Sequence, residues 1–371
     1  MQNPIQINVL VSPLDWGIGH ATRCVPIINK LLKKGCNVII ASDGRSGEFL
    51  RKEFPSLKHV SINAYHIKYP KSGKHMVLMM ALQIPRIVRA IKKEHVLLMK
   101  IVRENKINLI ISDNRYGLWH KNIYSVFMTH QLMLKVPKGF SFAEKIIHKM
   151  IIRLIHRYDE CWVPDYEDSE NISGDLSHKY KISENTHFIG PLSRFSDIDC
   201  KPDEFQKEID ILFLLSGPEP QRTIFENLIL SHLSESDVKA VVLKGITEKD
   251  EEVKLNENVI VYSHLSTEKM AALIRKARIV VSRSGYSTIM DLLVLEADAV
   301  FVATPGQTEQ EYLASYLTHK KLFCSIKQSE FNIKSVIDTI NNPISENKQV
   351  FKNDDLLTKR IDIITEYILK K

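Results

Sequence analysis

The most constraining feature of this chain is a buried strand that runs into a polar turn and a new helix at residues 277–295. The apolar run 277–281 is followed by residues 282–291, which read SRSGYSTIMD, and a helix is predicted over 287–295. A second apolar run, 299–303, ends at a Pro-Gly turn that opens another helix. Two strand ends and two helix N-termini therefore face one crevice, where free N–H groups and positive dipole ends suit a phosphate. Asp291, one turn into the first helix, is placed to reach a ribose hydroxyl pair.

The same alternation of strands and helices runs through the whole chain. In the first half it predicts strands over 5–11, 37–41, 107–111, 123–128 and 160–163 and helices over 21–34, 76–103 and 142–157, with Pro85 expected to kink or divide the long helix. In the second half it predicts strands over 209–215, 240–243, 259–262, 277–281, 299–303 and 322–325, and a last helix over 356–369. Such alternation is typical of parallel sheets with helices on both faces. We therefore predict an α/β protein with two doubly wound, Rossmann-like domains that face a central cleft.

The domain boundary is predicted after a polar stretch, 165–185, and a Gly-Pro turn at 190–191. This gives an N-terminal, acceptor-side domain over 1–192 and a C-terminal, nucleotide-sugar-binding domain over 193–371. The pattern leaves open whether the last helix packs back on the N-terminal domain. A chain of 371 residues is long enough for two domains of ordinary size.

The two halves of the chain carry opposite net charge. Residues 1–157 hold 26 Lys and Arg against 8 Asp and Glu, a net charge of +18, and the remainder holds 25 against 36, a net charge of −11. A basic half attracts anionic membranes, nucleic acids or anionic substrates. No nucleic-acid motif accompanies it, so no nucleic-acid partner is expected. The helix at 142–157 alternates basic and apolar residues, which suits either an anionic membrane surface or a core-packed helix with a solvated basic face.

The remaining composition favours a cytoplasmic protein. No apolar run approaches the roughly 20 residues of a spanning helix, and the first residues lead straight into a strand, so no signal peptide is evident. The five cysteines are scattered without CxxC spacing, which argues against a metal site or disulfides. The basic half would then meet either the inner face of the cytoplasmic membrane or only a substrate.

Two candidates for a general base follow strands of the first half. His20 comes after two glycines in the first loop, Gly17-Ile18-Gly19, and is expected to face the cleft as the base unless it only caps the helix. Asp113 follows the strand at 107–111 and is a second candidate base or a ligand of a sugar hydroxyl; the sequence does not choose between them. The first loop also partly fits GxGxxG, with Asp43 placed as an NAD-ribose acid, but Thr22 replaces the third glycine, so a dehydrogenase is the weaker reading.

The motifs resemble those of the peptidoglycan N-acetylglucosaminyltransferase (MurG-like) family, glycosyltransferase family 28. Residues 283–291 resemble its RSGxxTxxE motif, residues 307–314 its DxQxxNA-like segment, and Gly17-Ile18-Gly19-His20 and His130-Gln131 resemble parts of its GGxGGH and HEQN segments. The resemblance implies the GT-B fold, a UDP-sugar held mainly by the second domain, ribose at Asp291, and donor sugar at Glu309 and Gln310. Glu309 stands where the family has a glutamine. The residues expected to bind the donor are Ser216, Gly217, Arg283, Ser284, Gly285, Tyr286, Ser287, Asp291, Gln307, Glu309 and Gln310, and those expected on the acceptor side are Gly17, Gly19, Arg23 and His130.

The sequence is therefore interpreted as a glycosyltransferase that moves a sugar from a UDP-sugar to an acceptor hydroxyl. The resemblance implies inversion at the anomeric carbon. Helix dipoles and Arg283 would meet the phosphate charge, so no metal and no cofactor besides the UDP-sugar are expected. A lipid-linked acceptor suits the basic half, and a soluble anionic acceptor fits equally. Residues 17–23 also resemble the GxGHxxR loop of the UDP-sugar hydrolase of pseudaminic acid biosynthesis, so a hydrolase of the same fold, or a non-catalytic nucleotide-sugar-binding protein, stays as the alternative.

Overall fold

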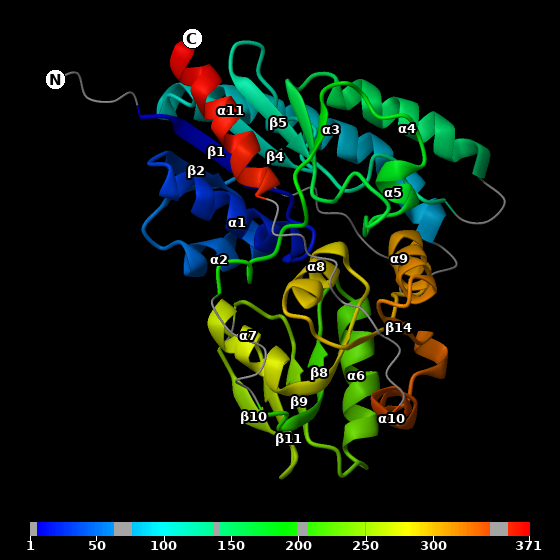
Figure 1. Ribbon diagram of the computed structural model, residues 1–371. Coiled ribbons are helices and arrows are strands. Elements are labelled where there is room, and N and C mark those ends of the chain that lie inside the picture. Colours follow the sequence, from blue (N-terminus) through cyan, green and yellow to red (C-terminus); the bar gives the residue numbers. More distant parts are fainter. Residues whose placement is uncertain (1–5, 63–75, 137–140, 199–205, 249, 342–354) are drawn as a thin grey trace.

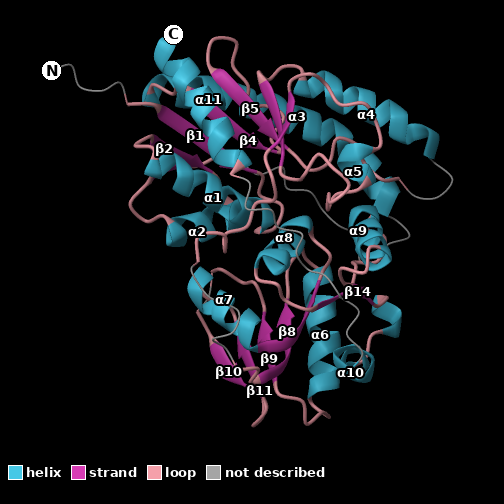
Figure 2. Cartoon of the chain, viewed as in Figure 1, coloured by secondary structure: helices cyan, strands magenta, loops and turns pink. Residues whose placement is uncertain are grey.

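The computed structural model describes residues 6–62, 76–136, 141–198, 206–248, 250–341 and 355–371. Two α/β domains lie one above the other in Figure 1, and each is built on a parallel sheet with helices on its faces. Figure 2 shows the strands gathered into these two separate sheets. The two-domain α/β architecture predicted from the alternating pattern is thus confirmed.

The N-terminal sheet has seven parallel strands in the order β3-β2-β1-β4-β5-β6-β7. Its strands are β1 (Asn8–Pro13), β2 (Asn37–Ala41), β3 (Lys58–Val60), β4 (Leu109–Asp113), β5 (Tyr124–Met128), β6 (Glu160–Val163) and β7 (Thr186–Phe188). Its helices are α1 (Gly19–Lys33), α2 (Gly44–Glu53), α3 (Met76–Asn105), α4 (Ser141–Ile155) and α5 (Asp175–His178). The central strands are buried along their length, which explains why they read as continuous apolar runs.

The C-terminal sheet also has seven strands, in the order β10-β11-β9-β8-β12-β13-β14, and only β10 is antiparallel to its neighbour. Its strands are β8 (Ile209–Leu214), β9 (Ala240–Leu243), β10 (Glu252–Lys254), β11 (Val259–Tyr262), β12 (Ala277–Ser282), β13 (Ala299–Phe301) and β14 (Cys324–Ser325). Its helices are α6 (Gln221–Leu233), α7 (Thr267–Lys276), α8 (Tyr286–Val294), α9 (Thr308–His319) and α10 (Ile333–Asn341), with a short 3-10 turn, η3 (Gln328–Glu330).

The last helix, α11 (Leu356–Lys370), lies against the N-terminal domain although it follows the C-terminal sheet in sequence (Figure 1). Arg360 pairs with the buried Glu160 of β6, Lys30 of α1 donates to Asp355 over 2.7 Å, and Leu357, Ile361 and Ile364 are buried. The sheets themselves are separated between Phe188 and Ile209, the stretch that contains the boundary predicted at 192/193.

Strand register brings the loops of each sheet to one edge. In the N-terminal domain Pro13 pairs with Asp113, which pairs with Met128, so the segments after β1, β4 and β5 start side by side. In the C-terminal domain Ser282 pairs with Leu214 in the same way. The carboxyl ends of both sheets therefore supply the loops that meet between the domains, as parallel sheets require.

Several local predictions need correction. Pro85 does not divide the long helix, because α3 continues through it from Met76 to Asn105. Strand β13 ends at Phe301, two residues before its predicted end. The short strands β3 and β10 were not predicted; both lie towards an outer edge of their sheets, with three residues each.

Four cysteines are free and buried, at positions 24, 36, 161 and 324, and Cys200 lies outside the described residues.

Candidate active site

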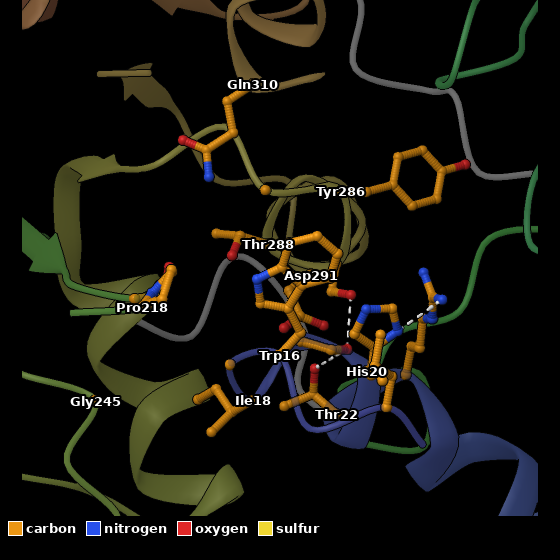
Figure 3. A pocket seen from close by; sticks show the side chains of 18 of the residues that line it. Trp16, Ile18, His20, Thr22, Pro218, Gly245, Tyr286, Thr288, Asp291 and Gln310 are labelled. Carbon is orange, nitrogen blue, oxygen red and sulfur yellow. Dashed lines mark hydrogen bonds between the residues drawn. The ribbon is translucent and has the colours of Figure 1, made fainter. Parts of the chain in front are cut away.

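A cavity of about 390 Å³ lies between the two domains. The loops after β1, β5 and β8 and the first turns of α1, α8 and α9 contribute to its wall. In Figure 3, Ile18, His20 and Thr22 from the N-terminal domain lie opposite Pro218, Thr288 and Gln310 from the C-terminal domain. The lining residues used below are Trp16, Gly17, Gly19, His20, Arg23, Ile87, Tyr116, His130, Gln131, Leu134, Arg194, Ser216, Gly217, Gly285, Tyr286, Ser287, Asp291, Gln307, Glu309 and Gln310.

His20 lies in the first turn of α1 and lines this cavity. Its Nδ1 is 3.0 Å from Oδ1 of Asp113 and 2.9 Å from Nη2 of Arg23. Nδ1 therefore has an acceptor, Asp113, and a donor, Arg23, within hydrogen-bond distance; in the tautomer in which Nδ1 donates to Asp113, the Nε2 atom keeps a free lone pair, which is the form that a general base needs. The first-loop position that the sequence assigned to His20 therefore agrees with its place at the cavity wall.

Asp113 stands behind His20, and its predicted role as a base is wrong. Its side chain is fully buried and is absent from the cavity wall, and Arg23 holds it with Nε at 2.7 Å and with Nη2. Burial raises the pKa of Asp113, but Arg23 and His20 outweigh this and bring the pKa to about 2. A carboxylate that stays ionised and out of reach of a substrate orients His20; it does not take a proton.

A chain of polar contacts links this pair to the other domain. Arg23, predicted on the acceptor side, is buried, and its Nη1 lies 2.9 Å from Nδ1 of His130. The Nε2 atom of His130 lies 2.8 Å from Oε1 of Glu309 in α9, and the His130 ring stacks on Tyr286 with centroids 4.1 Å apart. The sequence predicted these residues separately for the two substrates, and the fold joins them in one network.

The N-terminus of α8 faces the cavity, as the strand–turn–helix pattern predicted. Gly285 is its N-cap residue, and no side chain caps the helix, so its first N–H groups stay available to a ligand. Ser287 Oγ donates to the carbonyl of Gly19 over 2.7 Å, which joins the first turns of α8 and α1. A Cβ at Gly19 would lie 3.2 Å from that Oγ, which gives a physical reason for a glycine there.

Two predicted donor contacts in the same turn are wrong. Ser284 is fully buried, does not line the cavity, and uses its hydroxyl on the carbonyl of Gln310 over 2.8 Å. Arg283 also points away from the cavity wall. Its guanidinium donates to the carbonyls of Val302, Ala303 and Gln221 and lies over the Phe225 ring.

Burial lowers the pKa of Arg283 to about 9. Arg283 therefore fixes the loop after β13 and the start of α6, and it does not supply charge to a phosphate.

Asp291 lines the cavity, but it is already engaged by the interdomain segment. Ser193 Oγ donates to Oδ1 over 2.6 Å, and Nε of Arg194 lies 3.6 Å from Oδ2. Burial raises the pKa of Asp291 to about 6, although Arg194 and Ser193 act in the opposite direction.

Arg194 is a cavity residue that the sequence reasoning missed. It is 7% exposed, and its Nε and Nη1 atoms have no hydrogen-bond partner among the described residues. The Gly-Pro turn just before it had marked only a domain boundary, so no local signal indicated that this arginine reaches the site.

The remaining predicted donor residues all lie at the cavity wall. Ser216 and Gly217 follow β8, and Gly217 has φ +103°, a left-handed conformation that favours glycine. Gln307 is the N-cap residue of α9, and Oε1 of Gln310 accepts from the Thr304 N–H over 2.9 Å, which leaves its amide NH₂ for a ligand. Asp43, the acid of the dehydrogenase reading, instead caps α2 by accepting from Gly44 over 2.9 Å and does not line the cavity.

Comparison with known proteins gives a domain match and relatives that span most of the chain. Residues 222–366 match the glycosyltransferase family 28 C-terminal domain. A UDP-N-acetylglucosamine--N-acetylmuramyl-(pentapeptide) pyrophosphoryl-undecaprenol N-acetylglucosamine transferase of Rickettsia akari is 23% identical over 368 residues, which cover 92% of this chain and 91% of the relative.

Two solved structures show the same fold. The MurG structure of Acinetobacter baumannii has a TM-score of 0.54 at 12% identity and covers 99% of this chain and 100% of its own. A structure titled LpCGTa in complex with UDP has a TM-score of 0.62 at 10% identity and covers 98% and 99%. The predicted GT-B fold and family resemblance are confirmed. The chain is a glycosyltransferase of the GT-B fold, and it is similar to glycosyltransferase family 28, whose C-terminal domain its residues 222–366 match.

Proposed function

We propose that this glycosyltransferase uses a UDP-sugar as donor and a lipid-linked hydroxyl as acceptor. The observation that carries the proposal is the position of His20, which faces the N-termini of α8 and α9 across the cavity and is backed by Asp113. The donor is supported by the wall of the C-terminal domain and by the name of the Rickettsia relative, a transferase that uses UDP-N-acetylglucosamine. None of the relatives compared above is named as a hydrolase.

In the proposed reaction, the acceptor hydroxyl attacks the anomeric carbon from the N-terminal side of the cleft. Nε2 of His20 takes the hydroxyl proton, the bond from that carbon to the phosphate oxygen breaks, and UDP leaves with the electron pair. Asp113 stabilises the imidazolium that forms, because it stays ionised beside Nδ1. Attack from the face opposite UDP inverts the anomeric configuration.

The charge of the diphosphate would be met by backbone groups. The open N-terminus of α8 and the Ser216-Gly217 turn lie on the same side of the cavity, and both can present N–H groups. Arg194 and Asp291 lie at the neighbouring part of the wall, where ribose and base would bind. We propose that these groups act without a metal ion, so that transfer persists in the presence of a chelator.

The acceptor side of the cavity is mainly apolar. Trp16, Ile87, Tyr116 and Leu134 line it, and Ile87 belongs to α3. On the same helix Leu82 is 69% exposed, and on α4 Phe142 is 69% exposed, beside the basic residues of these helices. Among the described residues, no helix is long and apolar enough to cross a membrane. We propose that α3 and α4 rest on an anionic membrane at the cytoplasmic face, which would bring a lipid-linked acceptor to the cavity.

The direct test measures UDP release from UDP-N-acetylglucosamine, UDP-glucose and UDP-galactose, with and without vesicles made from bacterial membrane lipids that include polyprenyl-diphosphate-linked sugars. We expect release that depends on the vesicles and persists in EDTA. We also expect a loss of 10²-fold or more in His20→Gln with UDP binding retained. His319→Gln, an exposed histidine at the end of α9, is the matched control. UDP release that needs no acceptor would contradict transfer and indicate hydrolysis.

A further inference from the structure

The sugar end of the cleft holds a carboxylate where the related motif has a glutamine. Glu309 lies in the first turn of α9, lines the cavity and keeps a quarter of its side chain exposed. With the diphosphate at α8, the first turn of α9 and His20 enclose the space left for the sugar. The assignment of this space to the sugar rests on the proposed function, because it assumes a UDP-sugar donor.

His130 fixes the position of this carboxylate and also its charge. Its Nδ1 faces the Arg23 guanidinium at 2.9 Å and can only accept, so Nε2 carries the ring proton and donates it to Oε1 of Glu309 over 2.8 Å. Burial lowers the pKa of His130, which keeps the ring neutral. Burial alone would raise the pKa of Glu309, but neighbouring groups, foremost the hydrogen bonds from His130 and Gln131, outweigh burial and lower the pKa, so Glu309 is ionised at neutral pH.

No other charge in the described wall compensates Glu309. The charged side chains of that wall are Arg23, Arg194, Asp291 and Glu309. Arg23 is neutralised by Asp113 behind the wall, and Arg194 lies beside Asp291. The sugar end therefore carries one negative charge, on Glu309, that no other charged side chain of the described wall compensates.

We propose that Glu309, fixed by His130, selects donors whose sugar is uncharged and rejects donors whose sugar carries a carboxylate. The hydroxyls of a neutral hexose can donate hydrogen bonds to Glu309, whereas a hexuronate brings a second carboxylate into the same partly desolvated space. Like charges a few ångströms apart repel strongly at the low effective dielectric of such a site, and partial exposure of Glu309 reduces the effect to about tenfold in affinity.

The test compares UDP-glucose with UDP-glucuronate, which differ only in the oxidation of C6, by isothermal titration calorimetry. UDP-galactose and UDP-galacturonate form a second pair, and UDP alone measures the nucleotide site. In the wild-type protein we expect the UDP-linked uronate of each pair to bind about tenfold more weakly than the UDP-linked hexose, a difference of about 1.4 kcal/mol in binding free energy. In Glu309→Gln we expect the ratio to fall towards one with the UDP affinity unchanged.

Glu311→Gln is the matched control, because Glu311 lies two residues further along α9, accepts from the Gly306 N–H and does not line the cavity. It should keep the tenfold ratio. Equal affinities for hexose and uronate in the wild-type protein would overturn this inference alone, as would a ratio in Glu309→Gln that matches the wild-type ratio. Failure of UDP itself to bind would overturn the proposed function. Retained UDP binding in each variant shows that it is folded.

Discussion

Replacing Asp291 by asparagine should stabilise this protein at neutral pH while weakening the proposed nucleotide site. Asp291 is 7% exposed, and burial raises the pKa of its carboxyl group from 3.8 to about 6. In the folded protein it therefore binds a proton more readily than in the unfolded chain. Stability consequently falls as the pH rises from about 4 through 6, and the loss is complete above pH 7. Asparagine has the shape of the carboxyl group without the charge.

The size of the effect follows from the pKa difference. A rise in the pKa from 3.8 to about 6, at about 1.36 kcal/mol per pKa unit, lowers the free energy of unfolding by about 3 kcal/mol at pH 8. With about 2.1 cal/mol/K of unfolding entropy per residue over 371 residues, this corresponds to about 4 °C in melting temperature. Most of the difference between the two proteins should develop between pH 4 and 6.

The assay is differential scanning calorimetry of wild type and Asp291→Asn from pH 4 to 8, followed by titration with UDP. Asp237→Asn, an exposed substitution in the same domain, controls for the loss of a carboxylate. We expect Asp291→Asn to melt higher at pH 8, to match wild type near pH 4, and to bind UDP more weakly because the ribose loses a charged acceptor. A variant that melts lower than wild type at pH 8, or a difference that does not change with pH, would refute the reasoning.

Three further substitutions test other parts of the structure. Asp113→Asn should leave the buried Arg23 without its counter-charge and cost about 3 kcal/mol or more in stability, measured by chemical unfolding; an activity loss with unchanged stability would contradict the positioning role. Arg283→Met should lower the melting temperature by several degrees, because three backbone carbonyls lose their donor, and should leave the UDP affinity nearly unchanged. Phe142→Ser combined with Ile146→Ser should reduce sedimentation with phosphatidylglycerol vesicles about tenfold. The melting temperature should not change, since both side chains are exposed. Equal sedimentation of the variant and the wild-type protein would contradict a membrane contact of α4.

The sequence was sufficient for the central strands of both sheets because buried parallel strands read directly as apolar runs. The strands at 37–41, 160–163, 240–243 and 259–262 were predicted at their observed bounds, and helices α8 and α11 within one residue at each end. The strand–turn–helix at 277–295 also predicted an open helix N-terminus at the cavity, because local chemistry alone decides where a strand ends and an uncapped helix begins.

The sequence could not assign roles within those loops. Arg283, Ser284 and Gly285 are consecutive, yet only Gly285 lines the cavity, because the direction of each side chain depends on what packs behind it. Asp113 and His20 were equivalent candidates until burial and the Arg23 contact separated a fixed carboxylate from an accessible imidazole.

By itself, then, the sequence determined which segments form strands and helices and which loops gather at the carboxyl edges of two sheets, since both depend on local pattern and on the geometry of parallel sheets. Only the tertiary structure decided which charges meet across the cleft. The pairing of His130 with Glu309, 179 residues apart, and of Asp291 with Arg194 depends on how the two domains pack. Desolvation and charge pairing, which set the ionisation of these groups, arise only after that packing is complete.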